Sequence, residues 1–215
     1  MLFRSRWIAS AYLLCLPLAI LSKENGALLP FYLLLIEVLF YRFRVQVSGD
    51  ASTGARQSLV SIHIWLAAVP TVMALAYLVY SPGFITDSYS TRDFTLPERL
   101  LTEARILLIY LGFILRPVTA EMGLFHDDIV ISTALLDPPS TLAALIALLV
   151  LALGAWLLRR RLPLVTFAIA FFVLAHSIES TALGLELMHE HRNYLASWGV
   201  LFALVCHLAA LWGPG

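Results

Sequence analysis

Long apolar runs alternate with short polar clusters along the 215 residues of this chain. Within the runs the apolar residues are continuous and do not alternate with polar ones, which favours helices over half-buried strands. A helix of about 20 apolar residues crosses the hydrocarbon core of a bilayer, where the backbone must form its own hydrogen bonds. The pattern therefore predicts transmembrane helices over residues 7–21, 27–41, 59–80, 141–158, 163–183 and 194–212.

A further apolar stretch, residues 100–115, is predicted not to cross the membrane. Short cytoplasmic loops are enriched in Lys and Arg, and basic residues gather at 4–6, 42–56 and 159–161. With the N-terminus in the cytoplasm, all these clusters are cytoplasmic only if 100–115 does not cross. We therefore expect a re-entrant or interfacial helix there, within an external region spanning residues 81–140.

Composition supports a membrane protein and argues against a nucleic-acid partner. Hydrophobic residues make up 60% of the chain and charged residues 13%, whereas soluble domains carry about a quarter charged residues. The mean hydropathy is +0.87. The formal net charge is zero, so the basic face that nucleic-acid binding needs is not expected. The predicted fold is an all-α, polytopic transmembrane helical bundle with about six spans plus one re-entrant or interfacial helix, embedded in the lipid bilayer.

The predicted topology brings polar clusters of the segments 22–26, 81–140 and 186–193 to one external face. Within the second of these segments, His126-Asp127-Asp128 places two carboxylates beside a histidine. This combination can hold a hard divalent cation such as Mg²⁺ or Mn²⁺. The alternative is a solvated loop with an Asp turn.

Other ionisable residues lie in or beside the apolar runs. Lys23 and Glu24 separate the first two expected spans, where such charges either reach the membrane surface and cap helices or belong to a site. His176 and Glu179 are three positions apart, so they share one face of a helix. Ionisable residues in a span are costly and tend to face a cavity or a partner.

The densest cluster is the segment 186–194, which reads Glu-Leu-Met-His-Glu-His-Arg-Asn-Tyr and holds more ionisable groups than a tight turn needs. Arg192 can bind a phosphate or pyrophosphate, since its planar guanidinium contacts two phosphate oxygens at once. Glu190 lies between two histidines and can orient Arg192, bind a metal or take a proton. A mutually paired helix cap is the alternative.

Several of these motifs resemble a known family. The segment 21–30, Leu-Ser-Lys-Glu-Asn-Gly-Ala-Leu-Leu-Pro, resembles a hairpin of the transmembrane and tetratricopeptide-repeat O-mannosyltransferases and their bacterial relatives. The segment 176–195 is similar to the bacterial version of that family's Glu-Arg-x-x-Tyr signature. The motifs at 116–117, 126–128 and 137–139 resemble the external loop between them. The motifs keep the family's order across nearly the whole chain.

The resemblance implies the multi-spanning glycosyltransferase-C fold and a transferase of the lipid-carrier-dependent type. A sugar would pass from a polyprenyl-phosphate donor to a protein or glycan acceptor, on the non-cytoplasmic face of the bacterial inner membrane. Catalytic roles would fall to Glu190, Asp127 and Asp128, and a metal site to His126, Asp127 and Asp128. The implied substrate-binding residues, cationic ones for the lipid phosphate among them, are Lys23, Glu24, His176, Glu179, His191, Arg192, Asn193 and Tyr194.

The sequence also departs from the family's pattern. The family's catalytic aspartate is expected in an external loop upstream of a segment like 21–30, and its tetratricopeptide repeats after the last spans. Neither is in this sequence, so we expect residues 1–215 to be the later membrane half of the fold. Two other classes of function are compatible with the residues. One is a transporter or flippase-like protein in which buried His and Glu side chains relay protons, and the other is a non-enzymatic scaffold.

Overall fold

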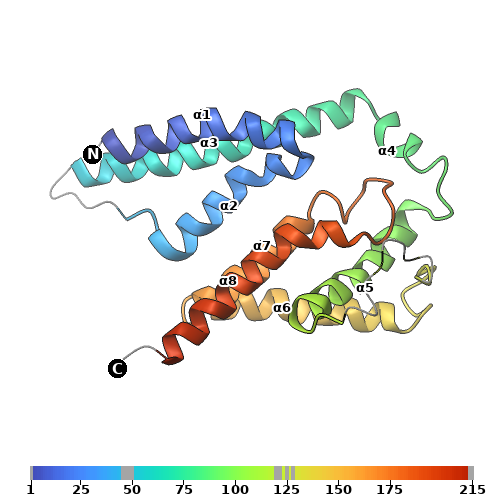
Figure 1. The fold of residues 1–215 in the computed structure, drawn as a ribbon. Coiled ribbons are helices and arrows are strands. Elements are labelled where there is room, and N and C mark those ends of the chain that lie inside the picture. Colours follow the sequence, from blue (N-terminus) through green and yellow to red (C-terminus); the bar gives the residue numbers. More distant parts are fainter. Residues whose placement is uncertain (1, 45–50, 119–122, 124–125, 127–128, 213–215) are drawn as a thin grey trace. The chain divides into compact units, whose positions relative to one another are not determined.

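The computed structural model describes residues 2–44, 51–118, 123, 126 and 129–212, and the regular elements in these ranges are helices (Figure 1). Within these described ranges, four helical segments are long and apolar enough to cross a membrane, namely Glu24–Tyr41, Arg56–Tyr80, Ser140–Leu158 and Glu190–Trp212. The predicted all-α, polytopic architecture is thereby confirmed. The chain divides into two compact units, Met1–Ser81 and Pro82–Gly215.

The first unit is a set of helical segments joined by one tight hairpin. Its elements are α1 (Leu2–Ser22), the 3-10 helix η1 (Glu24–Leu28), α2 (Leu29–Ile36), the π-helical turn η2 (Glu37–Tyr41) and α3 (Ala51–Tyr80). Between α1 and α2, a Cβ at Gly26 would lie 2.1 Å from the Ala19 carbonyl oxygen. Only glycine allows so close an approach of two backbone segments, so Gly26 fixes the hairpin.

The second unit begins with the short helix α4 (Gly83–Asp87) and contains a bundle of α5 (Leu96–Leu115), α6 (Ser140–Leu158), α7 (Pro163–His176) and α8 (Asn193–Trp212). α7 and α8 pack most extensively. Between them Phe171 is tilted on Trp198 at 5.3 Å between ring centroids, and a Cβ at Gly199 would lie 2.5 Å from the Phe171 ring. The missing side chain at Gly199 therefore lets the two helices approach.

The chain returns to the first half of α5 before α6 begins. The backbone N–H of Ser132 donates to the hydroxyl of Thr102 at 2.8 Å, and the hydroxyls of Ser132 and Thr141 are 2.8 Å apart. Thr102 lies in the second turn of α5 and Thr141 in the first turn of α6. Both helices therefore begin at the same end of the unit, as expected if α5 does not carry the chain across the membrane.

The helix predicted over residues 163–183 ends early, at His176. Beyond this residue, the hydroxyl of Ser177 donates to the carbonyl of Leu174 at 2.8 Å and that of Thr181 to the carbonyl of Ser177 at 2.9 Å. Such side-chain bonds compete with the helical backbone. Carbonyls farther along accept from a distant arginine instead of from helical N–H groups, and this interaction positions the candidate site.

Candidate functional site

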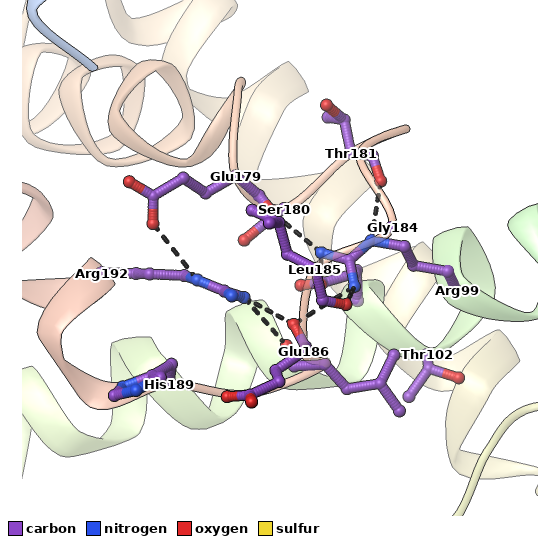
Figure 2. Close-up of polar contacts among 12 residues, drawn as sticks. Arg99, Thr102, Glu179, Ser180, Thr181, Gly184, Leu185, Glu186, His189 and Arg192 are labelled. Atoms are coloured by element: carbon purple, nitrogen blue, oxygen red, sulfur yellow. Dashed lines mark hydrogen bonds and ion pairs between the residues drawn. The ribbon is translucent and has the colours of Figure 1, made fainter. Parts of the chain in front are cut away.

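The segment 177–192, which joins α7 to α8, is held against α5 by the buried side chain of Arg99 (Figure 2). Its Nε donates to the carbonyl of Thr181 at 2.9 Å and its Nη2 to that of Glu179 at 2.8 Å. Its Nη1 donates to the carbonyls of Leu185 and Glu186 at 2.5 and 3.2 Å. A single guanidinium thus serves carbonyls of four residues and fixes the course of a segment without regular structure.

One ion pair lies within this segment and another lies beside it on α5, and all four side chains are at most 5% exposed. Arg99 pairs with Glu103, one turn further along α5, at 2.8 Å, and Arg192 pairs with Glu179 at 3.2 Å. Figure 2 shows the two arginines approaching the segment from opposite sides. Burial raises the pKa of Glu103, and the guanidinium groups of Arg99 and Arg192 oppose this effect. Two cations and two carboxylates balance, so the cluster is electrically neutral when all are ionised.

Tyr110, in the fourth turn of α5, aligns the residues that precede α8. Its hydroxyl donates to the carbonyl of His189 at 2.9 Å and accepts from the N–H of the same residue at 2.7 Å. Its own carbonyl accepts from the side-chain amide of Asn193 at 2.9 Å, and its ring stacks on His176 at 5.0 Å between centroids. The backbone of His189 therefore has a fixed position relative to α5.

A groove of about 640 Å³ opens at the start of α8. Its polar lining includes His189, Glu190, His191, Asn193 and Tyr194, and its apolar lining includes Phe113, Ile114 and Leu201. This combination of an apolar floor with a few convergent polar groups is typical of small-molecule sites.

Glu190 is the carboxylate of this groove, and two groups orient it. Its Oε1 accepts from the backbone N–H of Gly123 at 2.6 Å and lies 3.2 Å from Nε2 of His126. Beside it, Nδ1 of His191 lies 2.8 Å from Nδ1 of His189, so one ring nitrogen of this pair carries a proton that the other accepts. A positioned carboxylate can take a proton from a hydroxyl. An adjacent imidazole N–H can donate a hydrogen bond to an anionic leaving group.

The structure brings together many of the residues singled out from the sequence. Glu190, His191, Asn193 and Tyr194 line the groove, and His126 reaches it through Glu190. Three further candidates are buried behind the groove. Glu179 and Arg192 form an ion pair there, and His176 packs on Tyr110.

The remaining candidates are not placed in this site. Asp127 and Asp128 lie outside the described residues, so the predicted metal site at 126–128 stays a prediction. In the described part of the chain, no three His, Cys, Asp or Glu side chains gather as metal ligands. Lys23 and Glu24 belong to the first unit, where the N–H of Lys23 donates to the carbonyl of Ala19 at 3.0 Å and Glu24 is exposed.

Sequence reasoning missed the roles of Arg99, Glu103 and Tyr110. Arg99 and Glu103 are four positions apart and so face the same side of a helix. This spacing was a usable signal for a buried pair. Tyr110 gave no signal, because a tyrosine within an apolar helix is ordinary. The chain matches no protein-family model, no curated protein and no solved structure.

Proposed function

We propose that this chain is the later membrane part of a glycosyltransferase that moves a sugar from a polyprenyl-phosphate carrier to a protein or glycan acceptor. The observation that carries the proposal is the groove at the start of α8, in which the oriented carboxylate of Glu190 faces imidazoles and an apolar floor. A lipid-linked sugar phosphate has matching parts, namely a polar sugar, an anionic phosphate and an apolar chain. The motif order shared with the O-mannosyltransferases supports the same reading.

In this proposal Glu190 is the general base that takes the proton of the acceptor hydroxyl. Its contacts with Gly123 and His126 hold the carboxylate in place before the acceptor binds. The imidazole whose Nδ1 accepts in the His189–His191 pair donates from its Nε2–H to the phosphate as it leaves the sugar, and Asn193 and Tyr194 contact the sugar hydroxyls. A positioned base of this kind contributes about 10²–10⁴-fold to the rate.

Arg192 is the proposed cationic ligand of the phosphate, but its guanidinium already has partners within the protein. Its Nη1 donates to the carbonyl of Glu186 at 2.7 Å, and its Nε pairs with Glu179. Binding a phosphate requires the guanidinium to exchange the Glu186 carbonyl for a phosphate oxygen while keeping Glu179. If it makes no such exchange, Arg192 acts only by holding the turn that presents Glu190.

The proposal also includes a divalent metal, two donor-binding residues of the first unit and a membrane location. Mg²⁺ or Mn²⁺ would bind at 126–128, where His126 is the described residue. Lys23 and Glu24, which lie in the first unit, stay proposed donor-binding residues on the resemblance alone. The four apolar segments fit an integral membrane protein, and we propose the bacterial inner membrane with the groove on its non-cytoplasmic face.

A transporter that relays protons is the second candidate function, because two carboxylates are buried in the bundle. Glu103 and Glu179 are each 2% exposed, and the pKa of Glu103 is raised by burial. Buried ionisable residues of this kind occur along proton pathways. Proton uptake by vesicles containing the purified protein, lost in Glu103→Gln, would favour this function over sugar transfer.

Binding of a polyprenyl phosphate to the purified chain tests the primary proposal without requiring turnover. In lipid nanodiscs, His191→Ala and Tyr194→Ala should each weaken binding, and both side chains are exposed, so these variants should fold. Arg192→Ala should raise the Kd about tenfold to hundredfold, the worth of a charge-assisted contact, and Arg192→Lys should restore part of the loss. The matched control is Arg56→Ala, an exposed arginine of the first unit. Unchanged binding in the folded Arg192→Ala variant would leave Arg192 with the holding role alone. Unchanged binding in His191→Ala, Tyr194→Ala and Arg192→Ala alike would refute the site.

A further inference from the structure

A second groove of about 640 Å³ lies among α5, α6, α7 and α8, and its lining is almost wholly apolar. Along α7 it extends from Val165 to Val173, which is about 12 Å at the rise of 1.5 Å per residue. Leu148 and Ala152 line it from α6. Its shape and chemistry suit a hydrocarbon chain.

One end of this groove lies beside the turn between α6 and α7, which contains Arg159, Arg160 and Arg161. Val165 stands in the first turn of α7, directly after these arginines. Trp156 follows Ala152 by four positions and Arg159 follows it by seven, so all three share one face of α6. The face of α6 that lines the groove therefore ends in an exposed indole and a guanidinium.

These two end residues contact each other, and the sequence on either side of them adds no negative charge. The Arg159 guanidinium carbon lies 3.9 Å from the Trp156 ring centroid, and Nη1 donates to the Trp156 carbonyl. Arg160 and Arg161 are exposed, and the sequence has no acidic residue between Asp137 and Glu179. Trp is enriched at the level of the lipid head groups, so we expect the turn to lie at that level.

We propose that this groove binds an acyl chain of one anionic phospholipid, whose phosphate is held by Arg159, Arg160 and Arg161. Guanidinium groups bind phosphate oxygens bidentately. The apolar lining contacts the acyl chain through many small dispersion attractions. The residues that line this groove differ from those that line the Glu190 groove, and the arginine turn follows the end of α6 that lies farthest from Thr141. The site is therefore separate from the Glu190 groove and does not rest on the proposed sugar transfer.

Native mass spectrometry of the purified full chain, titrated with phosphatidylglycerol or phosphatidylcholine of identical acyl chains, tests the proposal. The wild-type protein should bind one phosphatidylglycerol with about tenfold to hundredfold preference, given the attraction of each surface arginine to anionic lipid. Changing all three arginines of the turn to Gln should reduce the preference to about twofold or less. The matched control changes Arg42, Arg44 and Arg56 to Gln and should keep it.

A groove-filling variant tests the acyl-chain part separately. Ala152→Phe should weaken binding of both lipids by about tenfold and leave their ratio unchanged, because it blocks the chain and not the head group. Thermal unfolding in detergent checks that each variant is folded. The proposal is overturned if the triple variant keeps its preference for phosphatidylglycerol or if Ala152→Phe binds lipid as the wild type does. It is also overturned if the protein appears as a lipid-free dimer, since a second copy of the chain would then be the occupant of the groove.

Discussion

Replacing Arg99 by methionine should lower the free energy of unfolding of the second unit by about 3–5 kcal/mol, the cost of removing one partner of a buried ion pair. The Arg99 side chain is 0% exposed and pairs with Glu103 at 2.8 Å. It also donates to backbone carbonyls at distances between 2.5 and 3.2 Å. Each buried acceptor left without a donor costs about 1–3 kcal/mol, so we expect a loss at the upper end of the range.

A double-mutant cycle separates the ion pair from the carbonyl contacts. Arg99→Met/Glu103→Met removes both buried charges, so neither is left unpaired. Its loss in the free energy of unfolding should be smaller than the summed losses of the two single variants by at least about 2 kcal/mol. Unfolding is followed by helical circular dichroism as sodium dodecyl sulfate is added to the protein in mild detergent. Arg160→Met, at an exposed arginine, is the control and should change stability by less than about 0.5 kcal/mol. A loss below about 1 kcal/mol for Arg99→Met, or strict additivity in the cycle, would refute the reasoning.

Two further predictions concern local packing and capping. Hydrogen bonds from the N–H and hydroxyl of Thr95 lower the pKa of Glu98, so their contribution to stability is present above the ordinary pKa of glutamate and is lost as the pH falls through the lowered one. Glu98→Gln should remove that part of the acid dependence in thermal unfolding scans, and an unchanged acid dependence would contradict it. Gly199→Ala should cost about 1–3 kcal/mol by overpacking against Phe171, whereas Gly154→Ala, with open space at the Cβ position, should be neutral or stabilising by up to about 1 kcal/mol. Equal effects at the two glycines would show that the Phe171 contact is unimportant.

Helix positions could be predicted where a continuous apolar run has clear polar or proline boundaries. The expected span 141–158 corresponds to α6 at Ser140–Leu158, because a continuous apolar run bounded by prolines and arginines has one stable state in lipid. The span 163–183 was predicted too long, since its end depends on Arg99. The guanidinium binds the carbonyl of Glu179, 80 positions away in sequence, and hydropathy carries no information about such a contact.

The candidate site was predictable as a cluster but not as a geometry. The charge density of 186–194 indicated chemistry there, and Glu190, His191, Asn193 and Tyr194 do line one groove. That Arg192 lies behind the groove, paired with Glu179, could not be read from its spacing, because Arg192 is adjacent in sequence to residues that face the groove. The apolar walls of the groove come from α5 and α8, whose packing brings together residues far apart in the chain.

Sugar transfer by Glu190→Gln tests the central claim most directly. The amide keeps the size of the side chain and can still contact Gly123 and His126, but it cannot take a proton. Membranes containing the full-length protein are supplied with a polyprenyl-phosphate sugar donor, and Glu186→Gln, at an exposed carboxylate four residues earlier, is the matched control. The account predicts at least about a hundredfold loss of transfer for Glu190→Gln, an unchanged unfolding temperature and near-normal transfer for Glu186→Gln. Near-normal transfer by the folded Glu190→Gln variant would contradict it.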